Sequence, residues 1–230
     1  MKNGFLLNVK NISFSWYTDG VPIFKSSKVG FWPLYLTINE FPYEIRFKKK
    51  TILAGLWFGN KKPNANYFVY KFRQQFENIF HRGIQIELPN INHTITVRGV
   101  LLRGACDLPA KAQFLNFVQF NSENGCPTCH CTGEQLPLDP RGSVRVYPYV
   151  ENPRMRTTEE CITYGDNATS DNPVMGIKGP NAFSRIMPDF MREIGIDKMH
   201  SVDGGIVKKI INALVSLKIQ KLCIFVVSIY

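Results

Sequence analysis

The sequence lacks any run of apolar residues long enough to cross a membrane. Its longest apolar run, residues 222–227, falls far short of the about 20 residues that a membrane-spanning helix needs. Residues 1–10 contain one short apolar patch and no small-residue cleavage site, so this segment does not resemble a signal peptide. We therefore expect no membrane partner and no export signal.

Acidic residues are also scarce. The chain has 18 Asp and Glu residues against 28 Lys and Arg residues, which gives a formal net charge of +10 at pH 7. A basic domain suits a polyanionic partner, most simply nucleic acid. The alternative is a soluble surface that is merely basic, so the charge alone leaves the partner open.

The cysteines do not have the spread of a disulfide framework. Three of the six, Cys126, Cys129 and Cys131, fall within six residues. This crowding indicates a metal site in a reducing compartment, which is the cytosol or the nucleus.

The first part of the chain has the hydrophobic patterns of β-strands. Ile12, Phe14 and Trp16 alternate with polar or amphipathic residues, which predicts a strand that ends at the turn Asp19-Gly20. Near-continuous apolar runs at residues 29–38 and 52–58 predict strands that are buried on both faces.

Helix patterns follow. Phenylalanines recur every four residues from Phe68 to Phe80, which predicts an amphipathic helix. Residues 95–105 predict one further strand. A second helix is then expected after Asp107, with one apolar face made by Ala110, Phe114, Phe117 and Val118.

The composition changes at residue 121. Eight of the 14 prolines lie in residues 127–188, which predicts a loop-rich stretch. Such a stretch needs an additional stabilising interaction to stay ordered. A helical pattern resumes near Gly204 and extends to Leu217. The apolar pattern of residues 221–230 differs from that of the preceding sequence. These residues are either a final buried strand or unrelated sequence.

Two aspartates mark the ends of predicted strands. Asp19 follows the first strand and Asp107 follows the later one. Carboxylates at neighbouring strand ends hold pairs of Mg²⁺ or Mn²⁺ ions about 4 Å apart in phosphoryl-transfer sites. Each residue also has a structural explanation, since Asp19 opens an Asp-Gly turn and Asp107 can cap a helix before a proline.

A stronger signal is the Cys-x₂-Cys pair formed by Cys126 and Cys129. Two thiolates at this spacing supply half of a tetrahedral zinc site. The local candidates for the other half are His130, Cys131 and Cys161. The distant candidate is the segment 197–200, which would pin the proline-rich stretch to the rest of the chain.

Basic clusters are candidates for contacts with DNA phosphates. Such runs are more often simply solvated faces. The candidate residues are Lys48, Lys49 and Lys50, then Lys61 and Lys62, and finally Arg141, Arg145, Arg154 and Arg156.

Taken together, these segments resemble cut-and-paste DNA transposases of the CACTA (En/Spm) type, including their animal relatives. They occur in the order of the family and cover roughly residues 12–217. The matching segments are YTDGVP (17–22), FKSSK (24–28), FWPL (31–34), AGLWFG (54–59), KP (62–63), CDLPA (106–110), FN (120–121), GCPTC (125–129), GIKG (176–179), DKMH (197–200) and GI (205–206).

The resemblance implies an α/β fold with an RNase H-like mixed sheet and flanking helices over residues 11–120. A zinc-binding insertion would cover residues 121–200, and residues 201–220 would begin the returning helix. Double-stranded DNA at transposon ends is the implied partner, the nucleus the implied location, and a homo-oligomer the implied assembly.

The resemblance also assigns residues. Asp19 and Asp107 fall at the positions of the first two catalytic acids, which bind Mg²⁺ or Mn²⁺. Cys126 and Cys129 match the zinc-binding cysteine pair. Asp197 and His200 match the element that completes the zinc site, and His200 is the ligand we expect more strongly.

The family's third acid has no counterpart here. It is a Glu on a helix beyond His200, but no Glu follows Glu193 and no Asp follows Asp203. Asp203 is a poor substitute because it follows His200 closely and is predicted to precede the helix. We therefore expect a chain that lacks the C-terminal end of the family's core and does not cleave DNA. The alternatives are a non-catalytic, zinc-containing remnant that binds DNA or protein, and a truncated product that folds poorly.

Overall fold

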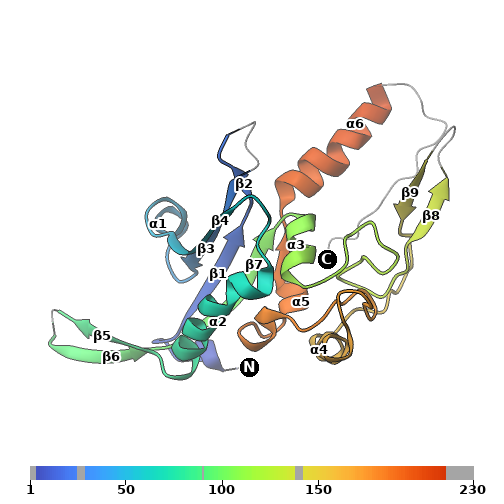
Figure 1. Ribbon diagram of the computed structural model, residues 1–230. Helices are drawn as coiled ribbons and strands as arrows, with labels where there is room; N and C mark the ends of the chain where they lie inside the picture. The colour runs from blue at the N-terminus through green and yellow to red at the C-terminus, as the bar shows by residue number, and fades with distance from the viewer. Residues whose placement is uncertain (1–3, 25–28, 90, 138–141, 216–230) are drawn as a thin grey trace.

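The computed structural model describes residues 4–24, 29–89, 91–137 and 142–215 (Figure 1). As predicted, these residues form a mixed α/β fold in which helices flank a mixed sheet. Arg141, Leu217 and residues 221–230 lie outside the described residues. The six strands of the main sheet are β1 (Ile12–Thr18), β2 (Val21–Pro22), β3 (Gly30–Ile38), β4 (Ile52–Gly59), β7 (Gly99–Cys106) and β10 (Ile194–Ile196).

The direction of the strands sets the geometry of the molecule. The order is β10-β7-β1-β3-β2, and β4 also pairs with β3. The three strands β1, β3 and β4 form antiparallel pairs, whereas β7 runs parallel to β1 and β10 runs parallel to β7. The carboxyl ends of β1, β7 and β10 therefore lie at the same edge of the sheet.

The other elements surround this sheet or project from it (Figure 1). The helical ones are η1 (Phe5–Leu7), α1 (Tyr43–Lys48), α2 (Ala65–His81), α3 (Leu108–Phe114), α4 (Thr158–Asn167), η2 (Ala182–Arg185), α5 (Phe190–Glu193), η3 (Met199–Val207) and α6 (Lys208–Val215). Two small hairpins pair β5 (Ile84–Leu88) with β6 (His93–Val97) and β8 (Glu134–Pro137) with β9 (Ser143–Val146). Within the described residues, no helix combines the length and the apolar character needed to span a bilayer.

The predicted alternation of β1 is confirmed for its apolar residues. Phe14 and Trp16 are buried. Ser13 is buried as well, because its backbone N–H and its hydroxyl both donate to Oε1 of Glu40, at 2.9 and 2.8 Å. A buried hydroxyl is tolerated when it has such a partner.

Trp16 lies at the centre of the hydrophobic core. Its ring stacks on Phe183 with centroids 4.7 Å apart and contacts Phe114 at 5.6 Å. Its indole N–H also points at the sulfur of Met187, 3.3 Å away. Residues after position 176, which the sequence assigned to the insertion, thus help to build the core under α2 and α3.

The expectation that residues 52–58 are buried on both faces is wrong. Leu53, Leu56 and Phe58 of β4 are more than half exposed. β3 is the only described strand that pairs with β4, so β4 lies at an edge of the sheet. An apolar run predicts a strand well, but it does not say how many layers cover that strand.

The single strand predicted at residues 95–105 is two strands. β6 ends at Val97 and belongs to the small hairpin, whereas β7 begins at Gly99 and enters the main sheet. Between them, the guanidinium of Arg98 donates to the carbonyl of Phe80 at 2.7 Å, which ties the break to the end of α2.

Two helix boundaries also differ from expectation. α3 ends at Phe114, and Asn116 has a φ of 51°, so Phe117 leaves the helix although it remains buried. The returning helix begins earlier than predicted, because η3 starts at Met199. Asp203 therefore lies within a helical segment and not before it.

Close packing at Trp16 leads to a testable prediction. A Cβ atom on Gly104 of β7 would lie 2.3 Å from the indole ring of Trp16. We expect Gly104→Ala to lower the free energy of unfolding by about 1–3 kcal/mol, because overpacking displaces a buried ring. Gly195→Ala, on the neighbouring β10, is the control, since its Cβ would meet only a backbone oxygen at 3.6 Å. Equal urea midpoints for the two variants would contradict this account of the core.

Candidate functional site

Three aspartates meet at the carboxyl ends of the parallel strands. Asp19 follows β1, Asp107 follows β7 and Asp197 follows β10. They line one hollow of about 350 Å³, which we call the strand-end hollow. Its lining residues are Tyr17, Thr18, Asp19, Ala105, Cys106, Asp107, Ile196, Asp197 and Lys198.

Asp19 is exposed at the rim of this hollow. The residue after it, Gly20, packs so closely on Trp32 that an added Cβ would lie 2.5 Å from the ring. Lys62 lies over the same ring, with its Nζ 5.7 Å from a ring centroid. This contact brings one of the predicted basic residues near the Asp19 side of the hollow.

Asp107 has the helix-capping role that its position in the sequence allowed. Its Oδ1 accepts a hydrogen bond from the backbone N–H of Ala110 at 2.7 Å, at the start of α3. Among the described residues, no hydrogen bond engages Oδ2. One carboxylate oxygen thus fixes the helix, and the other can face a ligand.

Asp197 reaches the hollow because its backbone extends the pairing of β10 with β7. Its N–H donates to the carbonyl of Cys106 at 2.8 Å. Its carboxylate accepts from the N–H of Met199 at 2.8 Å and pairs with Nδ1 of His200. Partial burial alone would raise the pKa of Asp197, but these hydrogen bonds hold it below its ordinary value.

His200 responds to the same group of acids. Its hydrogen bond with Asp197 raises its pKa, and the negative charges of Asp197, Asp19 and Asp107 act in the same direction, against a lowering by desolvation. The structure therefore groups Asp197 and His200 with the predicted catalytic pair. Sequence reasoning had assigned them to zinc, and only the parallel pairing of β10 reveals their place.

Cys126 and Cys129 form a compact turn, which we call the cysteine turn (residues 126–129). Their sulfur atoms are 3.4 Å apart, and the N–H of Cys129 points at the sulfur of Cys126, also at 3.4 Å. Burial raises the pKa of both thiols. Cys131 is near enough to Cys129 to act on the pKa of its thiol.

The segment 154–156 runs antiparallel beside the cysteine turn. The N–H of His130 donates to the carbonyl of Arg154 at 2.9 Å, and the N–H of Arg156 donates to the carbonyl of Thr128 at 3.0 Å. Arg156 is only 1% exposed, so the expectation that it neutralises DNA phosphates is wrong. The sequence did not predict the structural role of Arg156, because an arginine within a basic cluster is expected to be exposed to solvent.

The donors are not assembled around a single ion. Among the described residues, no three His, Cys, Asp or Glu side chains form a group that could hold one metal ion. The chemistry of the donors still differs between the two places. The strand-end hollow offers hard carboxylate oxygens, and the cysteine turn offers soft sulfur.

The remaining predicted basic residues differ in their exposure. Lys48, Lys49 and Lys50 are exposed at the end of α1, where Lys48 pairs with Glu44 at 2.5 Å. Lys61 is exposed after β4. Arg145 is half-buried and donates to the carbonyl of Gly133 at 2.8 Å, which ties it to its own hairpin.

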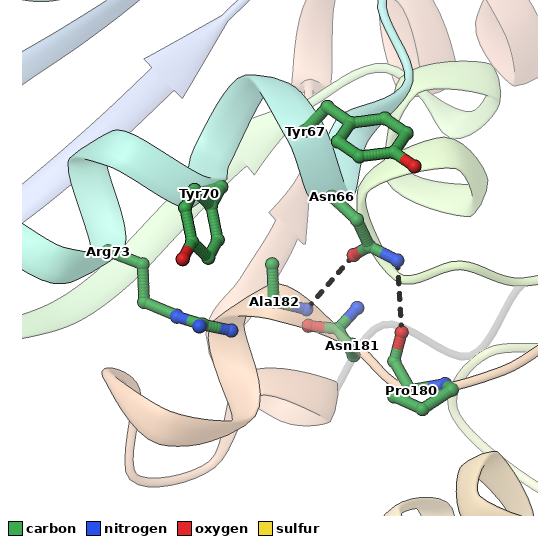
Figure 2. A pocket seen from close by; sticks show the side chains of 7 residues that line it. All are labelled: Asn66, Tyr67, Tyr70, Arg73, Pro180, Asn181 and Ala182. Carbon is green, nitrogen blue, oxygen red and sulfur yellow. Dashed lines mark hydrogen bonds between the residues drawn. The ribbon is translucent and has the colours of Figure 1, made fainter.

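A second hollow, of about 360 Å³, lies between α2 and residues 180–182 (Figure 2). The side chain of Asn66 bridges the two segments: it accepts from the N–H of Ala182 and donates to the carbonyl of Pro180, both at 3.1 Å. No carboxylate lines this hollow. The lining residues are Asn66, Tyr67, Tyr70, Arg73, Pro180, Asn181 and Ala182. These contacts join residues 180–182 to α2, and the hollow offers no carboxylate to a metal ion.

The two roles of Asp107 can be separated by substitution. Asp107→Asn keeps an oxygen that accepts from Ala110, so we expect the free energy of unfolding to change little. Asp107→Ala removes the cap and should lower it by about 1 kcal/mol. Urea unfolding of both variants in metal-free buffer tests this. Equal losses in the two variants would show that the cap does not stabilise α3.

The comparison with known proteins bears directly on these residues. A model of the transposase family tnp2 matches residues 1–155 of the 230-residue chain. The matched range contains Asp19, Asp107 and the cysteine turn, and it ends before Asp197. A search of curated proteins found no match. The family match covers more than half of the sequence, and the chain therefore belongs to the tnp2 family of transposases.

Proposed function

We propose that this chain derives from the catalytic core of a CACTA-type DDE transposase, whose full-length ancestor carries out metal-dependent cleavage and strand transfer of DNA. The family match supports a transposon-derived transposase. The observation that carries the finer proposal is the strand-end hollow, because it places Asp19 and Asp107 at the carboxyl ends of adjacent parallel strands. Neighbouring strand ends are where a two-metal site needs its carboxylates.

The sheet supports an RNase H-like core. Three strands that form antiparallel pairs, β1, β3 and β4, are followed along the chain by β7 and β10, which add in parallel on the other side of β1. We propose that residues 11–120 supply the first four of these strands and that the chain returns after the insertion to add β10.

The residues present fit Mg²⁺ or Mn²⁺. When bound, such ions activate water or a 3′-hydroxyl and stabilise the leaving oxygen at the scissile phosphate. Asp19 would hold one ion from the rim, and the free oxygen of Asp107 would hold it from the start of α3. Mg²⁺ is usually bound by only one or two carboxylates, with waters and substrate phosphates as the other ligands. DNA would thus complete a site that the described residues leave open.

We propose that the 230-residue chain binds DNA but does not cleave it. Within these 230 residues no Glu follows Glu193, so they do not themselves supply the third acid that the resemblance implies. Asp197 adds a carboxylate to the hollow, but its oxygens are engaged by Met199 and His200. It therefore replaces the missing acid poorly.

Cys126 and Cys129 are proposed ligands of one structural Zn²⁺. In a tetrahedral site with Zn–S bonds of about 2.3 Å, two sulfurs are about 3.8 Å apart. The 3.4 Å in the cysteine turn is close to this value. His130, beside the turn, supports the proposal as well. Nδ1 of its buried side chain has no hydrogen-bond partner, so this nitrogen is available to a metal ion. The resemblance assigns the remaining positions to Asp197, which lines the strand-end hollow, and to His200, which pairs with Asp197.

The second candidate function is a non-catalytic remnant that holds DNA through its basic surface, and the net charge of +10 favours it. Both candidates act in the nucleus. For the transposase candidate, we propose a homo-oligomer in which two copies of the chain hold the two transposon ends.

DNA binding and nicking test the two properties that both candidates predict, which are binding through the basic surface and the absence of cleavage. We expect a duplex oligonucleotide to bind with an affinity that falls steeply with salt. The double variant Lys61→Gln/Lys62→Gln should reduce the slope of log K against log salt by about 2, because about one released counterion is lost for each lysine. Fluorescence anisotropy at several salt concentrations measures this slope.

The same protein should not nick supercoiled plasmid in Mg²⁺ or Mn²⁺. Nicking that is lost in Asp19→Asn but kept in Asp171→Asn, a change at an exposed acid far along the chain, would overturn the proposed inactivity. Binding that ignores salt would contradict the proposed DNA surface.

A further inference from the structure

Arg156 carries a positive charge that the described protein does not balance. The residue is 1% exposed, and its Nη1 and Nη2 atoms have no hydrogen-bond partner. Among the described residues, no carboxylate lies within 4.0 Å of its guanidinium, since none of the ion pairs includes it. An unpaired buried charge is strongly unfavourable, so this arrangement calls for a partner.

The contacts of Arg156 point to the cysteine turn. Its Nε–H is shared between two carbonyl oxygens, that of Cys126 at 2.9 Å and that of Cys129 at 3.0 Å. These carbonyls belong to the first and last residues of the turn. A single planar group thus fixes the backbone that sets the distance between the two sulfurs.

The surroundings of the guanidinium are otherwise apolar or sulfur-bearing. Its Cζ lies 5.0 Å above the centroid of the buried Phe117 ring. Cys161 is near enough to interact with Arg156: burial raises the pKa of the Cys161 thiol to about 11, and the charge of Arg156 opposes that shift.

Another buried basic side chain, that of Lys111, interacts electrostatically with Cys126. Lys111 of α3 is 4% exposed and forms no ion pair within 4.0 Å among the described residues. Burial lowers its pKa, and its interactions with Cys106 and Cys126 oppose that shift. Lys111 is thus a second buried basic side chain within electrostatic reach of Cys126.

We propose that Arg156 is the positioning residue of the cysteine turn, which it holds in a metal-binding shape while its charge favours the metal-bound thiolates. This inference rests on the proposal that Cys126 and Cys129 bind zinc. Metal binding requires deprotonated thiols, so it releases protons and leaves negative charge on the sulfurs. The charge of Arg156 would then be balanced in part by the anionic sulfurs, and its Nε–H would orient the metal ligands through their backbone, as outer-shell hydrogen bonds commonly do.

The test is Co²⁺ binding by the full 230-residue chain, followed by the thiolate-to-cobalt absorption band, with Zn²⁺ competition. We expect Arg156→Gln to weaken Co²⁺ affinity by about 10–100-fold, the range found for groups that orient metal ligands. It should also move the midpoint of pH-dependent binding upward, because the thiolates lose a favourable charge. Arg154→Gln is the matched control: its guanidinium is two residues away but 67% exposed and pairs with Glu160, so its affinity should equal that of the wild type.

Arg156→Lys keeps the charge but loses the shared Nε–H contact. This variant should weaken Co²⁺ affinity while leaving the midpoint of pH-dependent binding near the wild-type value. It replaces Arg156→Gln in the test if circular dichroism shows that Arg156→Gln is unfolded. Wild-type affinity, within twofold, in any folded Arg156 variant overturns the inference and leaves zinc binding by the turn intact. A wild-type chain without the cobalt band, or one whose band survives Cys126→Ser, overturns both the inference and the zinc proposal. Neither result bears on Asp19 and Asp107.

Discussion

The parallel pairing of β1, β7 and β10 is the constraint on which the rest of the structure depends. A parallel pair cannot be closed by a tight turn, so the chain must run back toward the other edge of the sheet before it adds β7 and again before it adds β10. Each return ends at the same edge, and each of the three strands is followed there by an aspartate. The strand-end hollow is thus a product of topology, because its acids are distant in sequence and adjacent only through the sheet.

The long excursion between β7 and β10 has to be anchored for this pairing to form. Phe183 stacks on Trp16, and Asn66 of α2 fastens residues 180–182. Earlier in the excursion, Arg156 clamps the cysteine turn. These contacts bring late segments onto a core that begins at residue 12, so the excursion contributes to the core at one end and carries the cysteine turn at the other.

The sequence predicts the local features of this fold well and its long-range partners poorly. The alternation in β1 and the phenylalanine repeat of α2 predict a strand and a helix because both patterns are local. The exposure of β4 and the burial of Arg156 could not be predicted, since they depend on which segments cover them. Asp197 is the sharpest example: its spacing to His200 suggests zinc, and only the register of β10 with β7 places it beside Asp107.

The central claim is that Asp19 and Asp107 together hold a divalent metal ion at the strand ends. Electron paramagnetic resonance of free Mn²⁺, titrated with the purified protein, measures this binding directly. The account predicts a Mn²⁺ site in the wild type that is weakened at least about tenfold in Asp19→Asn, since one of very few carboxylate ligands is lost. Asp107→Asn should be weakened similarly, and Asp171→Asn should not be weakened at all. Equal Mn²⁺ affinity in the wild type and in Asp19→Asn would contradict the account.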